Sequence, residues 1–135
     1  MENCIFCKIA NGKVSSEKIW EDESFTAVLD INPVTTGMTL VIPKKHCSSY
    51  IFENEDETIQ TAMLAAKKVA KMLENAFNAK KVAVILEGLE VDHLHVKLFP
   101  LKDGNSIKSI LNSDFPKPSE EELHLLALEI IDKNK

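Results

Sequence analysis

A segment in which polar and apolar residues alternate strictly constrains the fold most. Positions 91–100 read Val-Asp-His-Leu-His-Val-Lys-Leu-Phe-Pro. Side chains two residues apart lie on the same face of a β-strand. We therefore expect one row of side chains to face a core and the other to face solvent. The core-facing row is Leu94, Val96 and Leu98, and the solvent-facing row is His93, His95 and Lys97. Three nitrogen-bearing side chains in one row favour a site for an anion or a metal ion.

The composition is typical of a globular protein, with 135 residues, 44% of them hydrophobic and 27% charged. A chain of this length can bury a substantial core, and we expect one domain spanning residues 1–135. The net charge of −5 gives no general attraction to nucleic acids or membranes, so we expect neither as a partner. The first residues do not resemble a signal peptide, and no apolar stretch is long enough to span a bilayer. We therefore expect a cytoplasmic protein.

The three cysteines are not expected to form disulfides in a reducing compartment. Cys4 and Cys7 have the C-x-x-C spacing, which is often no more than two half-buried thiols. Together with His46 and His93, they have the composition of a closed Cys2His2 zinc site. The sequence leaves both interpretations open. We assign no role to Cys47.

The pattern along the chain predicts an α+β fold. Four short β-prone runs precede the histidine segment, at 18–22, 25–30, 39–43 and 81–86. Apolar residues at helical spacing predict a long helix over 59–77, capped by Asn54 and Glu57. Ser119 and Glu122 form a capping-box pattern before a short final helix, and one helical turn fits at 107–111 within the loop 102–118.

This order of elements predicts a mostly antiparallel five-stranded sheet with one long helix and a C-terminal helix. The long helix should cover one face of the sheet. The histidine row must then lie on the other face.

Five motifs between residues 4 and 100 occur in an order that is typical of one protein family. They are Cys-Ile-Phe-Cys-Lys-Ile (4–9), Trp-Glu-Asp (20–22), Leu-Asp-Ile-Asn-Pro (29–33), Gly-Met-Thr-Leu-Val-Ile-Pro-Lys-Lys-His (37–46) and His-x-His-x-Lys-x-x-Pro (93–100). In these motifs the chain resembles histidine triad (HIT) proteins of the Hint-like and bacterial branch. The resemblance implies a HIT-like fold and a homodimer whose sheets join edge to edge. Residues 101–135 form an extension with no motif that we can interpret.

The resemblance also implies a nucleotide site on the open face of the sheet. The usual reaction is cleavage of nucleoside phosphoramidates or related purine nucleotide conjugates through a nucleotidyl-histidine intermediate. By motif position, His95 would be the nucleophile and Lys97 would contact the phosphate. Asp30 would accept hydrogen bonds from ribose hydroxyls, and Gly88 matches a glycine of the loop before the histidines. The residues that match the base-enclosing positions are Phe6, Ile9, Val28 and Ile31.

Other interpretations of these residues stay open. Asp30 also fits a turn, and Val28 also fits the core. A subgroup of HIT proteins binds zinc through residues that match Cys4, Cys7, His46 and His93, and the resemblance therefore implies a structural Zn²⁺ ion.

The chain departs from the family pattern at two places near the expected phosphate site. Lys97 replaces the third histidine, and Leu89 replaces a glutamine of the preceding loop, which also lacks the family's asparagine. A lysine ammonium can pair with a phosphate oxygen, but it cannot accept a proton while it is charged. The alternative function is therefore a non-catalytic or weakly catalytic nucleotide-binding or regulatory module stabilised by zinc.

Overall fold

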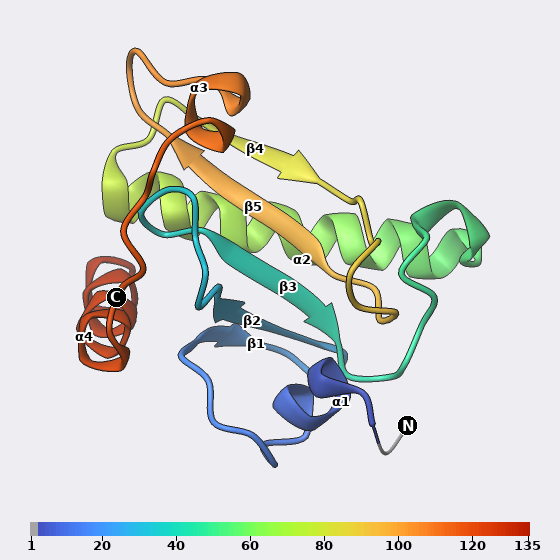
Figure 1. Ribbon diagram of the computed structural model, residues 1–135. Coiled ribbons are helices and arrows are strands. Elements are labelled where there is room, and N and C mark those ends of the chain that lie inside the picture. Colours follow the sequence, from blue (N-terminus) through green and yellow to red (C-terminus); the bar gives the residue numbers. More distant parts are fainter. Residues whose placement is uncertain (1–2) are drawn as a thin grey trace.

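The computed structural model describes residues 3–135 and shows one antiparallel sheet with helices on both faces (Figure 1). The elements, in chain order, are α1 (Ile5–Ala10), β1 (Lys18–Glu21), β2 (Phe25–Leu29), β3 (Thr39–Pro43), the 3-10 helix η1 (Ile51–Glu53), α2 (Asp56–Phe77), β4 (Lys81–Ile85), β5 (Val96–Leu101), α3 (Ile107–Leu111) and α4 (Glu120–Lys133). The predicted α+β fold with five strands, one long helix and a C-terminal helix is confirmed.

The five strands lie in the order β1-β2-β3-β5-β4, and every neighbouring pair is antiparallel. After α2 the chain first forms the outer strand β4 and then places β5 between β4 and β3. Val96 of β5 pairs with Val41 of β3, and Lys97 lies between Leu40 of β3 and Ile85 of β4. The residues that enter β5 are therefore placed at the centre of the sheet.

The main core lies between the sheet and α2, with α4 packed beside them (Figure 1). As predicted, Leu94, Val96 and Leu98 belong to this core, and all three side chains are completely buried. The opposite side of the sheet, on which Val28, Leu40 and Ile42 lie, is called the open face below. One end of the open face is covered by α1 and the other by α3. Among residues 3–135, no helix is long and apolar enough to cross a membrane.

The predicted exposure of the histidine row was wrong for two of its three members. β5 begins only at Val96, and the histidines precede it in irregular backbone. His93 is 0% exposed and His95 is 5% exposed, whereas Lys97 is half-buried. The reason is that α1 packs across this end of the open face, and its Phe6 ring contacts both imidazoles edge-on.

The predicted cap of the long helix was also wrong. The N-cap of α2 is Glu55, while the Asn54 side chain donates hydrogen bonds to the carbonyls of Ser48 and Tyr50, at 2.9 and 3.1 Å. Asn54 thus stabilises the turn around η1, which the sequence did not predict. The capping box of Ser119 and Glu122 is confirmed at the start of α4, and so is the helical turn at 107–111.

Candidate functional site

Four side chains that are distant in sequence meet in one cluster between α1, the end of β3 and the segment before β5. One ligand atom from each of Cys4, Cys7, His46 and His93 lies within 4.8 Å of the others. The Nδ1 atom of His93 is 3.3 Å from the Sγ of Cys4 and 3.4 Å from the Sγ of Cys7. The Nδ1 atom of His46 is 3.4 Å from the same Cys7 sulfur.

These distances fit a tetrahedral metal ion. Metal–sulfur bonds of about 2.3 Å and metal–nitrogen bonds of about 2.0–2.1 Å place neighbouring ligand atoms about 3.5 Å apart in a tetrahedron. The Nε2–H of His93 donates to the carbonyl oxygen of Pro43 at 2.8 Å, since a carbonyl can only accept. Nδ1 of His93 therefore carries the lone pair and points at the two sulfurs, as in second-shell arrangements of metal-bound histidines. The four residues can hold a metal ion.

Local backbone structure explains how the two cysteine sulfurs come to lie side by side. Cys4 is the N-cap of α1, and its Sγ accepts a hydrogen bond from the main-chain N–H of Cys7 at 3.3 Å. One helical turn therefore holds both sulfurs on the same side of the helix end. Burial, with the neighbouring Cys4 as a further cause, raises the pKa of the Cys7 thiol. The thiol form is favoured at this position until a bound cation compensates the thiolate charge.

The second motif histidine has a defined tautomer. The Nδ1–H of His95 donates to the main-chain carbonyl of His93 at 2.7 Å, which leaves the lone pair on Nε2. Burial lowers the pKa of His95, and Lys97 lowers it further, although the hydrogen bond to His93 and the carboxylates of Asp30 and Glu90 oppose this shift. The imidazole is therefore neutral near pH 7 and offers Nε2 as a nucleophile or base.

The open face beside His95 has an apolar wall. Phe6 contacts the His95 ring at 4.9 Å between centroids, and it belongs to one apolar cluster with Val28, Leu40 and Ile42, against which Ile9 packs. Three of the four residues expected to enclose a base therefore lie in one place. Ile31 is outside this cluster and is 58% exposed.

Asp30 follows β2 and lies in a tight turn. Its main-chain N–H donates to the carbonyl of Met38, and its Oδ1 accepts the main-chain N–H of Asn32 at 2.8 Å. The turn role that the sequence left open is therefore present. One oxygen of the carboxylate accepts its hydrogen bond within the turn, and the charge of Asp30 partly opposes the lowering of the His95 pKa that burial causes.

The loop before the histidines is fixed to the segment that precedes η1. Gly88 has a φ of +69°, and its carbonyl accepts the Ser49 hydroxyl at 2.8 Å. A Cβ atom at Gly88 would lie 2.5 Å from the carbonyl oxygen of Ser49. Ser49 also donates its main-chain N–H to Asp92 at 3.2 Å. The sequence carried no signal for Ser49, whereas the alternation within β3 could have identified Leu40 and Ile42 as part of the open face.

The sequence and the fold are similar to those of known proteins. Residues 11–104 match the family model of the HIT domain. The chain is 33% identical over 135 residues to the adenosine 5′-monophosphoramidase hnt1 of Schizosaccharomyces pombe, which covers 98% of this chain and 99% of that protein.

Solved structures of the same family share the fold. A hypothetical histidine triad nucleotide-binding protein from Sulfolobus tokodaii has a TM-score of 0.80 and 32% identity, covering 96% of this chain and 91% of its own. A zinc-bound histidine triad family protein from Mycobacterium smegmatis has a TM-score of 0.71 and 26% identity, covering 98% of this chain and 96% of its own.

Proposed function

This chain belongs to the HIT family, and we propose that it is a nucleotide hydrolase or transferase in which His95 is the nucleophile. The observation that carries this proposal is the hydrogen bond from His95 Nδ1 to the carbonyl of His93, which leaves a neutral Nε2 with its lone pair. A nucleophilic imidazole must be neutral and must have a free lone pair on the attacking nitrogen. The adenosine 5′-monophosphoramidase of Schizosaccharomyces pombe supports the same class of substrate, a nucleoside phosphoramidate or related purine nucleotide conjugate.

The proposed reaction has two steps. His95 Nε2 attacks phosphorus, an N–P bond forms, and the bond from phosphorus to the leaving amine breaks as that amine takes up a proton from solvent. Water then cleaves the nucleotidyl-His95 bond, which yields the nucleoside monophosphate, returns a proton to solvent and restores the neutral imidazole. Lys97, which pairs with Leu40 on the open face, would neutralise the phosphate oxygens as charge builds up.

The other roles follow from position on the open face. Phe6, Ile9 and Val28 would enclose the base together with Ile31, which would move onto it from its exposed position. The free oxygen of Asp30 would accept a ribose hydroxyl, and the main chain at Gly88 would line the phosphate end.

We further infer that the ion held by Cys4, Cys7, His46 and His93 is zinc. Two thiolates and two imidazoles are a preferred ligand set of zinc, and four protein ligands leave no position for a reacting water molecule. The zinc-bound relative from Mycobacterium smegmatis supports this assignment. The ion would be structural and would hold α1 against the strand ends.

We also propose a homodimer formed through β4. Within residues 3–135, this strand pairs with β5 alone, and its Val84 is 40% exposed. An open strand edge of this kind is suited to pairing with the same strand of a second copy.

The direct test is hydrolysis of adenosine 5′-phosphoramidate by the wild type and by His95→Ala. We expect turnover by the wild type and a loss of at least about a thousandfold in the variant, since removing a nucleophile removes the covalent route. His124→Ala is the matched control, because His124 is an exposed histidine on α4 that pairs with Glu17. Equal rates for wild type and His95→Ala would contradict the proposal.

A second candidate function rests on Lys97 and Leu89. Lys97 stands where the family motif carries a histidine, and Leu89, at the position of a glutamine, is 83% exposed. A module with these residues would bind a nucleotide without cleaving it. If calorimetry detects AMP binding and the wild type shows no turnover, this candidate is supported. Absence of AMP binding overturns both the hydrolase and the binding module.

A further inference from the structure

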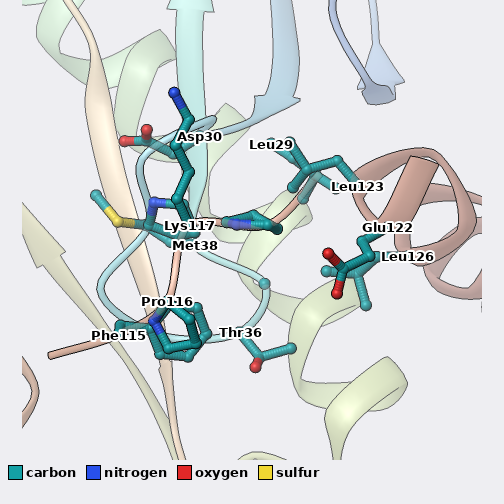
Figure 2. A pocket seen from close by; sticks show the side chains of 13 residues that line it. Leu29, Asp30, Thr36, Met38, Phe115, Pro116, Lys117, Glu122, Leu123 and Leu126 are labelled. Carbon is teal, nitrogen blue, oxygen red and sulfur yellow. The ribbon is translucent and has the colours of Figure 1, made fainter. Parts of the chain in front are cut away.

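A cavity of about 290 Å³ lies at the end of the sheet next to Asp30 (Figure 2). One wall is the loop between β2 and β3, and the other is the segment that leads into α4. It is lined by Leu29, Asp30, Pro33, Thr36, Gly37, Met38, Phe115, Pro116, Lys117, Pro118, Glu122, Leu123 and Leu126. A cavity of roughly 150 Å³ already accommodates benzene, so this one has room for an aromatic group with its linker.

The wall formed by the β2–β3 loop is held in place by hydrogen bonds to its main chain and by close packing. The main-chain N–H of Asp30 donates to Met38, and the Thr39 hydroxyl donates to the Gly37 carbonyl at 2.8 Å. Gly37 has a φ of +84°, and a Cβ atom there would lie 2.3 Å from the Phe77 ring. The loop is therefore packed tightly against the end of α2.

The second wall is supplied by residues beyond the part of the chain that matches the HIT domain, which ends at residue 104. Pro116 and Pro118 restrict the backbone of this segment. The capping box of Ser119 and Glu122 fixes the first turn of α4, which presents Leu123 and Leu126 to the cavity. Residues after position 104 thus form one wall of this cavity.

Charged side chains lie at the rim of an apolar interior. Figure 2 shows the Asp30 carboxylate and the Lys117 ammonium on one side of the cavity, and the Glu122 carboxylate on the other. The interior between them is formed by Met38, Phe115 and the leucines of α4. An apolar group with polar atoms at its attachment point matches this distribution.

We propose that this cavity is a subsite for an apolar acyl group carried on the 2′ or 3′ oxygen of the ribose. The inference rests on the proposed function, in which Asp30 contacts the ribose hydroxyls. Asp30 also lines the cavity. A group attached to the 2′ or 3′ oxygen of the ribose would therefore project from the nucleotide site into the mouth of the cavity. A group attached to phosphorus instead lies near His95. The chain would therefore select nucleotides acylated on the ribose.

The test compares AMP with 2′/3′-O-(N-methylanthraniloyl)-AMP, whose aromatic acyl group is also fluorescent. We expect the acylated nucleotide to bind at least tenfold more tightly to the wild type, with a blue-shifted and stronger emission. Leu126→Trp, which fills the cavity, should reduce the ratio of the two dissociation constants to about one. Leu125→Trp is the matched control, since Leu125 is the adjacent residue, is 58% exposed and does not line the cavity.

A second measurement uses the wild type alone and does not depend on how Leu126→Trp folds. In methyl NMR spectra, the acylated nucleotide should shift Met38 and Leu126, whereas AMP should leave these signals in place. Equal affinities for the two nucleotides, or a ratio that Leu126→Trp leaves unchanged, would overturn the subsite. Absence of AMP binding would instead contradict the proposed function, so the two failures are distinguishable.

Discussion

His93 and His95 are joined by a 2.7 Å hydrogen bond in which the main-chain carbonyl of His93 accepts the Nδ1–H of His95. The ring of the same His93 points its Nδ1 at Cys4 and Cys7. One residue therefore belongs both to the proposed metal site and to the support of the proposed nucleophile. The position of His93 therefore affects both the contact with the cysteines of α1 and the tautomer of His95.

Removal of one metal ligand should release the ion and destabilise the protein. We expect Cys7→Ser to lose bound zinc and to melt at least about 10 °C lower, because structural zinc contributes roughly 10 kcal/mol or more in small peptides and 1 kcal/mol corresponds to about 4 °C in a domain of this size. Metal analysis and thermal melting measure both effects. Cys47→Ser is the control, since Cys47 is not in the cluster. Equal zinc contents in the two variants would contradict the assignment.

Loss of the Lys97 ammonium should weaken phosphate binding selectively. We expect Lys97→Ala to lower AMP affinity about 10- to 100-fold, since a hydrogen bond to a charged group contributes roughly 1.5–3 kcal/mol. Adenosine affinity should change by less than about twofold, because adenosine has no phosphate. Calorimetry measures both ligands, and Lys67→Ala on the exposed side of α2 is the control. An equal loss of affinity for AMP and adenosine would show that Lys97 supports the folded structure and does not bind the phosphate.

A side chain at Gly88 should disturb the loop before the histidines. We expect Gly88→Ala to destabilise the protein by more than the roughly 1–2 kcal/mol that a positive φ costs, because the new Cβ would also approach the Ser49 carbonyl oxygen at 2.5 Å. Gly104→Ala is a matched control, since Gly104 also has a positive φ, of +86°, but no atom lies within 4 Å of its added Cβ. Denaturant unfolding measures the stability of both variants. An equal loss of stability in the two would exclude the contact with Ser49 as the cause.

The capping box of α4 should make stability depend on pH. The main-chain N–H of Ser119, and then its hydroxyl, lower the pKa of Glu122 below 4.5. A lowered pKa in the folded state means that the stabilisation is present above pH 4.5 and is lost as the pH falls through the folded value. We expect Glu122→Gln to melt below the wild type at pH 7 and the difference to shrink at pH 3. A difference that is the same at both pH values would contradict this role.

The cap itself should have a measurable effect at neutral pH. We expect Ser119→Ala to lower the free energy of unfolding by about 1 kcal/mol, since the N-cap hydroxyl accepts the main-chain N–H of Glu122 at 3.0 Å. Ser119→Thr keeps a hydroxyl and should retain most of the stability. Denaturant unfolding of the three proteins tests this, and equal losses in both variants would exclude the hydrogen bond as the cause.

The sequence by itself determined which side chains face the main core. Alternation placed Leu94, Val96 and Leu98 on one side, and helical spacing identified α2, because both patterns repeat within a few residues. The residue types in the motifs also identified the four candidate metal ligands, which the structure brings together. α1 was missed because six residues are too few to show a helical period.

Only the tertiary structure decided the environment of the histidines. Burial of His93 and His95 depends on α1, whose sequence lies almost 90 residues earlier, and the ring of His93 is oriented by the carbonyl of Pro43. The cavity next to Asp30 likewise needs the extension after residue 104. Periodicity reports local geometry, whereas burial and hydrogen-bond partners are set by segments that meet only when the chain is folded.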